Sequence, residues 1–150
     1  MHTLDLVTIV VTGLMVGTEL TVSLFINPIM WQLDSAAQSR ALSLFARRLG
    51  FVMPFWYATC LILLITETVL RRGTTAFPTF LSASILWAAT IVYTVALLVP
   101  INNRVAALDT GDDFQQWIKD HKRWDGFHRL RIALILITLV MATHALLSAA

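Results

Sequence analysis

Four apolar runs, each about 20 residues long, dominate the chain. They cover roughly residues 6–26, 51–70, 77–99 and 128–147. A helix needs about 20 consecutive apolar residues to cross the hydrocarbon core of a bilayer. The pattern therefore predicts an all-α fold, a four-helix transmembrane bundle, that forms a single integral membrane domain over residues 1–150.

Two polar stretches connect these runs on one side of the predicted membrane, over residues 34–50 and 111–124. In both, apolar side chains recur at spacings of three and four, which places them on one face of a helix. We expect two short amphipathic helices on the membrane surface, the second one capped by Asp112 or Asp113. The connection on the other side, residues 71–76, is a tight turn.

Basic residues are distributed unevenly between the two sides. The side of the two long connections holds nine of the eleven Lys and Arg residues, and the other side holds Arg71 and Arg72. Loops rich in Lys and Arg stay in the cytoplasm. The sequence thus predicts a plasma-membrane or inner-membrane protein with cytoplasmic long connections and both termini outside. The first run follows Asp5 rather than basic residues, so we expect a retained helix and not a cleaved signal peptide.

The composition excludes several classes of protein. Hydrophobic residues make up 57% of the chain and charged residues only 13%, whereas a soluble domain carries about 25% charged residues. No basic face suited to nucleic acid is visible. The single cysteine, Cys60, rules out an intrachain disulfide and a multi-cysteine metal site.

Glu19 is a carboxylate inside the first apolar run. It precedes Asn27, at the end of that run, by eight residues, which places it about 12 Å inside the helix at 1.5 Å per residue. An acid at that depth is costly unless it is neutral, paired or beside water, so it is a candidate for function. The alternative is a protonated glutamate that hydrogen-bonds a neighbouring helix. Glu67 differs, because an i,i+4 ion pair with Arg71 explains it.

The segment "RWDGFHRLR" opens the fourth run with more polar chemistry than a topology signal needs. Trp124, His128 and Arg131 share one helical face by their spacing of three and four. Asp125 is expected to cap this helix at the backbone amide of His128. A histidine titrates near neutral pH, so His128 is either a general base in a site or a hydrated residue at the membrane interface.

Polar and aromatic residues of the other runs gather at the same depth. Their convergence predicts a ligand pocket in the cytoplasmic half of the bundle, with Trp124 and the following residues on its wall: Asn27, Trp56, Tyr57, Tyr93, Asn102, Asn103 and Arg104. The alternative is an interfacial belt of aromatic residues and snorkelling arginines. That belt explains Trp31 and Trp117 and is an alternative for Trp124, but it explains neither Glu19 nor the asparagines. No two histidines have a spacing of three or four, so we predict no metal site.

The layout resembles a family of small four-helix membrane proteins that includes the anthrone oxygenases. The matching features are "FINPIM" at the end of the first run, "VPINNRV" at the end of the third, and Trp124, His128 and Arg131 at the start of the fourth. The resemblance implies oxidation of polyketide anthrones to anthraquinones by O2 without a prosthetic group. It also singles out Asn102 and Arg104 as functional positions, besides the three in the fourth run.

The leading hypothesis is a cofactor-independent membrane oxygenase that acts on a lipophilic aromatic or enolisable substrate. Its chemistry needs a base, hydrogen-bond donors for an oxyanion and an apolar pocket. We expect His128 to be the base and Glu19 to relay a proton. Donors to the oxyanion are expected from Arg131, Asn102 or Asn103, and rings that stack on the substrate from Trp56, Trp87 or Trp124.

Two other hypotheses stay open. The first is a protein without catalytic activity that binds a lipid or another hydrophobic molecule, or that is a subunit of a membrane complex. The second is a haem-dependent or metal-dependent oxidoreductase in which His128 is a ligand. Gly13 and Gly17 form a GxxxG pattern, which favours close packing of the first helix on a partner, within the chain or in a homo-oligomer.

Overall fold

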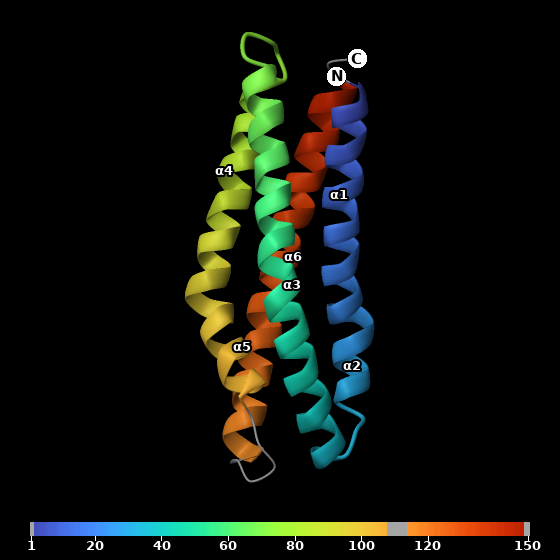
Figure 1. Ribbon diagram of the computed structural model, residues 1–150, viewed down its shortest axis with the longest axis vertical. Helices are drawn as coiled ribbons and strands as arrows, with labels where there is room; N and C mark the ends of the chain where they lie inside the picture. Colours follow the sequence, from blue (N-terminus) through green and yellow to red (C-terminus); the bar gives the residue numbers. More distant parts are fainter. Residues whose placement is uncertain (1, 108–113, 149–150) are drawn as a thin grey trace.

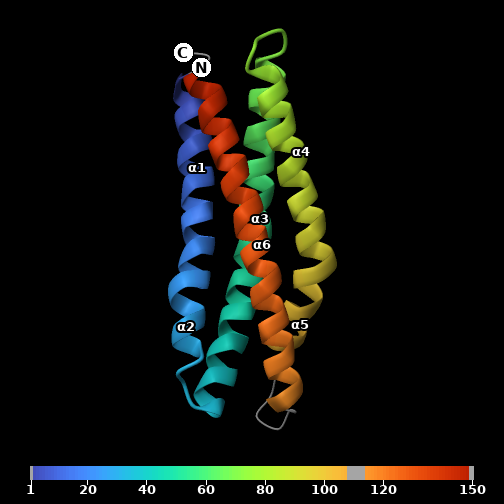
Figure 2. The same ribbon diagram turned by 180° about the vertical axis from the view of Figure 1, so that it is seen from behind.

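The computed structural model describes residues 2–107 and 114–148. In these ranges all regular structure is helical: α1 (His2–Thr21), the π-helical η1 (Val22–Ile26), α2 (Asn27–Met30), α3 (Ser35–Leu70), α4 (Phe77–Tyr93), the π-helical η2 (Thr94–Leu98), α5 (Val99–Ala106) and α6 (Phe114–Leu147). The segments α1–η1–α2 and α4–η2–α5 are continuous, so four long helices lie side by side (Figure 1, Figure 2).

Four helical stretches of the described chain are long and apolar enough to cross a membrane: Thr3–Met30, Ser35–Leu70, Phe77–Ala106 and Ile118–Ser148. The all-α four-helix prediction is therefore confirmed. The start of α1, the end of α6 and the turn at residues 71–76 lie at one end of the bundle, called here the terminal end (Figure 1). The α2–α3 connection and the start of α6 lie at the other, called the connecting end.

The two polar stretches are helical, as predicted, but they are not separate helices. Each forms the first part of a longer helix, because α3 and α6 continue through Gly50 and Gly126 without a break. A single glycine inside a helix costs only about 1 kcal/mol, which packing along a long helix offsets. Asp34 caps α3 by accepting from the amides of Ala36 and Ala37. The predicted caps of the second stretch, residues 112 and 113, lie outside the described residues.

Two prolines near the ends of apolar runs, Pro28 and Pro100, widen their helices and do not end them. A proline inside a helix lacks an amide hydrogen, and its ring collides with the carbonyl four residues earlier. For Pro28 and Pro100 these carbonyls belong to Leu24 and Ala96, the central residues of η1 and η2. The backbone accommodates each proline by a single π-helical turn and then continues, to Met30 and Ala106. Such π-turns are frequent at functional sites.

The core is divided into two apolar clusters. The larger includes Met15, Leu64, Phe80, Trp87 and Ile135, all fully buried. A smaller cluster near the connecting end joins α2, α3 and α5: Met30, Leu42, Ala46, Ile101 and Val105. The outer surface carries many exposed apolar side chains, as expected where lipid replaces water.

The predicted packing of Gly13 and Gly17 against another helix of the same chain is not observed. A Cβ added to either glycine would meet no atom within 4 Å. Among the described residues, therefore, no neighbour uses the close approach that these glycines permit.

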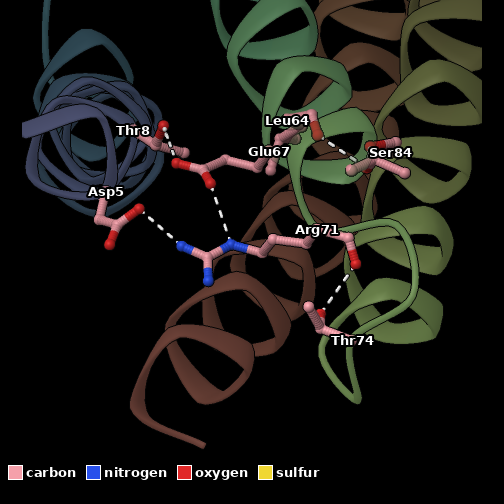
Figure 3. A network of polar contacts seen from close by, with 8 residues as sticks. Asp5, Thr8, Leu64, Glu67, Arg71, Thr74 and Ser84 are labelled. Carbon is pink, nitrogen blue, oxygen red and sulfur yellow. Dashed lines mark hydrogen bonds and ion pairs between the residues drawn. The ribbon is translucent and has the colours of Figure 1, made fainter. Parts of the chain in front are cut away.

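A buried ionic network, called here the terminal network, ties α1 to α3 at the terminal end (Figure 3). Arg71 donates from Nη2 to Asp5 at 2.6 Å and from Nε to Glu67 at 3.1 Å. Thr8 donates to the other oxygen of Glu67 at 3.2 Å. The guanidinium also lies 5.3 Å from the ring centroid of Phe80. The Glu67–Arg71 ion pair predicted from the sequence is confirmed.

Candidate active site

A cavity of about 240 Å³ lies between the two core clusters and contacts all four long helices. Most of its wall is apolar, with Leu42, Ala46 and Val105 of the smaller cluster among the lining residues. The polar and charged side chains on the wall, with Tyr57 and Trp124, form a separate set: Glu19, Asn27, Tyr57, Thr94, Asn102, His121, Trp124, His128 and Arg131. Such a wall suits an apolar ligand that a few polar groups orient.

Glu19 is the centre of the ionic part of the site. It comes from α1, is 1% exposed, and lies less than one turn before η1. Its Oε2 accepts from Nη2 of Arg131 at 2.6 Å, and its Oε1 accepts from the hydroxyl of Tyr57 at 3.0 Å. The Arg131 guanidinium also lies 5.6 Å from the ring centroid of Tyr57. Glu19 is thus paired with a cation, which is one of the conditions under which an acid at that depth is tolerated.

His128 completes this group and is fully buried. Its Nδ1 lies 2.9 Å from Nη2 of Arg131 and 3.3 Å from Oε2 of Glu19. Arginine can only donate hydrogen bonds, so Nδ1 accepts and the ring proton of neutral His128 resides on Nε2. Nε2 has no hydrogen-bond partner among the described residues. It is therefore the ring nitrogen left for a ligand in the cavity.

One face of α6 supplies four wall residues. His121, Trp124, His128 and Arg131 follow one another at spacings of three, four and three. The Trp124 ring stacks on His128 with a centroid distance of 4.5 Å, and on His121 at 6.1 Å. His121 was not predicted as a site residue, although its spacing of three from Trp124 and seven from His128 places it on the same helical face.

Tyr57 is held in place by the fully buried Trp87 of α4. The indole Nε1 donates to the Tyr57 carbonyl at 3.0 Å, and the two rings lie 5.5 Å apart. Trp87 does not line the cavity, so it positions a wall residue and does not offer a surface for stacking of a substrate, contrary to expectation.

Asp125 does not cap a helix, because α6 begins at Phe114 and Asp125 lies well inside it. Its Oδ1 accepts from the Asn27 amide at 2.8 Å, and its Oδ2 pairs with Arg129 at 2.8 Å. This contact joins α2 to α6 and fixes the orientation of Asn27 on the cavity wall.

Asn102 of α5 also lies on the wall, with its amide donating to the Ala46 carbonyl at 3.2 Å. Gly50 of α3 leaves room for this amide, because a Cβ there would lie 3.0 Å from Nδ2 of Asn102. The amide is therefore engaged with α3, and its oxygen is the atom left for a ligand.

Four residues predicted for the pocket do not line it: Trp56, Tyr93, Asn103 and Arg104. Trp56 faces α1 and donates to the Val11 carbonyl at 3.1 Å, while the Tyr93 hydroxyl donates to the Phe127 carbonyl at 3.2 Å. Arg104 is exposed and forms two hydrogen bonds to Asp120, at 2.8 and 3.1 Å. Asn103 is exposed as well.

Metal-ligating side chains are sparse around the site. No group of three or more His, Cys, Asp or Glu side chains in the described parts of the chain is arranged to hold a metal ion. The nearest approach to such a set is His128 beside Glu19.

Comparison with protein families matches the anthrone oxygenase model to residues 41–141, more than half of the chain. The chain belongs to the anthrone oxygenase family. No curated protein and no solved structure matches it. Within this anthrone oxygenase family member, the matched range contains Tyr57, Asn102, Trp124, His128 and Arg131 of the cavity wall. Glu19 and Asn27 come from α1 and α2, outside that range, so the site combines matched and unmatched segments.

Proposed function

We propose that this protein is a membrane oxygenase that oxidises a flat, lipophilic, enolisable aromatic ketone of the anthrone type with O2, without a resident cofactor. Membership of the anthrone oxygenase family supports the reaction class. The observation that carries the proposal is His128, a fully buried side chain whose Nε2 lacks a partner among the described residues at the wall of a largely apolar cavity. A buried polar atom without a partner is costly, and a ligand oxygen in the cavity would relieve that cost.

The proposed roles follow from which atoms of the site are occupied. Because the proton of His128 is on Nε2, we assign His128 as a donor to the substrate carbonyl rather than the base that the sequence suggested. A donor that meets developing negative charge in a dry site lowers the barrier substantially. Glu19 is the carboxylate on the cavity wall, and we assign it to take the benzylic proton. Arg131, held between Glu19 and His128, favours the enolate by its charge.

The chemistry then balances without a further reagent. Loss of the benzylic proton gives an electron-rich enolate, which is oxidised as its ring carbon forms a bond to O2. Glu19 returns its proton to the resulting peroxide. The same carbon then loses its second hydrogen as a proton while the O–O bond breaks, and the departing hydroxide takes up that proton, so that a quinone and one water are released. The protein has to hold the enolate flat, and Trp124, stacked on His128 at the wall, offers an aromatic surface for that purpose.

We further propose that the cavity lies in the cytoplasmic half of the membrane. The connecting end carries most of the basic residues, and the positive-inside rule then puts both chain termini outside. A substrate that dissolves in the bilayer reaches such a cavity without crossing water.

The test is turnover by protein purified in mild detergent, with O2 uptake measured beside quinone absorbance. We expect one O2 per quinone, and a His128→Phe variant, which keeps a ring against Trp124, should lose about 10²–10³-fold in kcat. Asn103→Ala, which changes an exposed residue off the cavity wall, is the control and should match wild type. Binding of the anthrone without O2 uptake would favour the ligand-binding alternative. Stoichiometric haem or metal in active protein would overturn the cofactor-free part.

A further inference from the structure

Five residues are both exposed to the outside of the bundle and part of the cavity wall along one seam between helices. Gly50, Pro54 and Ala58 lie on α3, and Val95 and Val99 lie on η2 and α5. Val95 is 59% exposed and Val99 is 36% exposed. A residue that faces both the cavity and the surroundings marks a place where the cavity approaches the surface. We name these five residues the seam.

We propose that the seam is a lateral window through which a flat apolar ligand enters the cavity from the hydrocarbon region of the bilayer. This inference rests on the proposed function and deepens it by naming the residues between which that substrate enters. It rests on the cavity behind the seam and on the buried, unpartnered Nε2 of His128 at the wall of that cavity.

Hydrogen bonds between helices lie beyond both ends of the seam but not between its two edges. Towards the connecting end, the Ala46 carbonyl accepts from Asn102 at 3.2 Å, and the Ala106 carbonyl accepts from Ser43 and Arg47. Towards the terminal end, the Tyr57 carbonyl, next to Ala58, accepts from Trp87 of α4 at 3.0 Å. Within the described parts of the chain, no hydrogen bond crosses the seam between the five residues themselves. The fixed ends leave a limited stretch in which side-chain motion alone can admit a ligand.

The side chains on the α3 edge are small and recur every fourth residue, from glycine through proline to alanine. Small residues at this spacing let neighbouring groups approach the backbone closely. On the opposite edge, η2 is the π-turn that Pro100 imposes, and π-turns interrupt the regular packing of a helix. Phe45 is a further exposed wall residue, but it lies about 140° around α3 from Gly50 and presents a bulky ring there.

The surroundings of the seam are apolar rather than aqueous. Phe51, Phe55 and Val92, which border it on α3 and α4, are 68%, 66% and 68% exposed. Large apolar side chains exposed to this degree are typical of a surface that faces lipid. The window therefore selects uncharged flat molecules that partition into the bilayer, and it keeps water from the enolate.

The test uses 9,10-anthraquinone, a flat tricyclic quinone that O2 does not consume, and the intact protein in lipid vesicles. Stopped-flow quenching of tryptophan fluorescence gives the association and dissociation rates. Ala58→Phe and Val95→Phe, on opposite edges of the seam, should each slow both rates by about tenfold, with a smaller change in affinity. Ile62→Phe is the matched control, because Ile62 lies one turn beyond Ala58, is 63% exposed and does not line the cavity.

Wild-type rates in both variants at the seam, or equal slowing by Ile62→Phe, would overturn the window. Because anthraquinone does not react, the outcome is independent of turnover. Slowed entry in these variants without anthrone oxidation by wild type would keep the window and reject the oxygenase. Wild-type entry rates in both seam variants, together with anthrone oxidation by wild type, would keep the oxygenase and reject the window. Complete absence of anthraquinone binding would overturn the ligand class and both proposals with it.

Discussion

The bundle contains two buried ionic networks, one towards each end, and they are built from similar parts. In the terminal network Arg71 joins Glu67 to Asp5. At the cavity Arg131 joins Glu19 to His128. In both, an arginine bridges helices that are far apart in the sequence. In both, the second oxygen of the glutamate accepts from a hydroxyl, of Thr8 in one and of Tyr57 in the other.

The networks differ in what they leave unsatisfied. No buried side-chain atom of the terminal network's described members lacks a partner, and none of these residues lines the cavity. At the cavity, Nε2 of His128 and Nε of Arg131 both lack partners, while Glu19 and both of these residues line the wall. In the first network the fold satisfies the buried hydrogen-bonding atoms. In the second, beside a cavity, two donor atoms are left that a ligand can satisfy. The terminal network therefore serves the stability of the fold, whereas the network at the cavity is a candidate functional site.

The largest expected effect is on stability, at the terminal end. Arg71→Met keeps a similar volume but leaves the buried Glu67 and the half-buried Asp5 without their cation. Loss of one partner from a buried pair costs about 3–5 kcal/mol. We expect that loss in the free energy of unfolding, measured by titration with a denaturing detergent, together with normal turnover per folded molecule.

The matched change at the cavity sharpens this prediction. Arg131→Met should lower the free energy of unfolding by less than Arg71→Met, because Arg131 pairs with one carboxylate, Glu19, whereas Arg71 pairs with two. Equal or greater destabilisation by Arg131→Met would contradict the distinction between the two networks.

The next largest effect is on catalysis, and it is expected when glutamine replaces one of the two glutamates but not the other. Glu19→Gln removes the proposed base and should lower kcat by about 10²-fold or more, measured as quinone formation under saturating anthrone. Glu67→Gln is the paired variant, which should leave kcat unchanged and lower the free energy of unfolding by about 1–3 kcal/mol. A loss of kcat in Glu67→Gln of the same size as in Glu19→Gln would remove the assignment of Glu19 as the base.

The sequence predicted those features of the two networks that depend on the position of a residue along its helix. Run length predicted the four long helices, and depth predicted that Glu19, His128 and Arg131 lie at one level. The spacing of the last two with Trp124 predicted a common face of α6, which the structure has. The i,i+4 spacing likewise predicted the Glu67–Arg71 pair.

The sequence could not predict the features set by rotation of each helix about its axis. In a membrane the outer face of a helix is as apolar as the inner face, so hydrophobic periodicity does not reveal which side faces the core. Trp56 was therefore expected at the pocket, although it faces α1. The contacts of Asn27 with Asp125 and of Arg71 with Asp5 join residues 98 and 66 positions apart, which local spacing does not encode.

The smallest expected effect concerns Arg104, which the family resemblance singled out and the structure places outside the cavity. Its pair with Asp120 is exposed on the arginine side, and exposed pairs contribute about 0.2–1 kcal/mol. Arg104→Ala should therefore lower the free energy of unfolding by no more than that and leave kcat for the anthrone within about twofold of wild type. Asp120→Ala, which breaks the same pair from α6, should behave alike. A tenfold loss of kcat in the arginine variant alone would mean that Arg104 acts on the substrate itself, and the site would then have to include the last turn of α5.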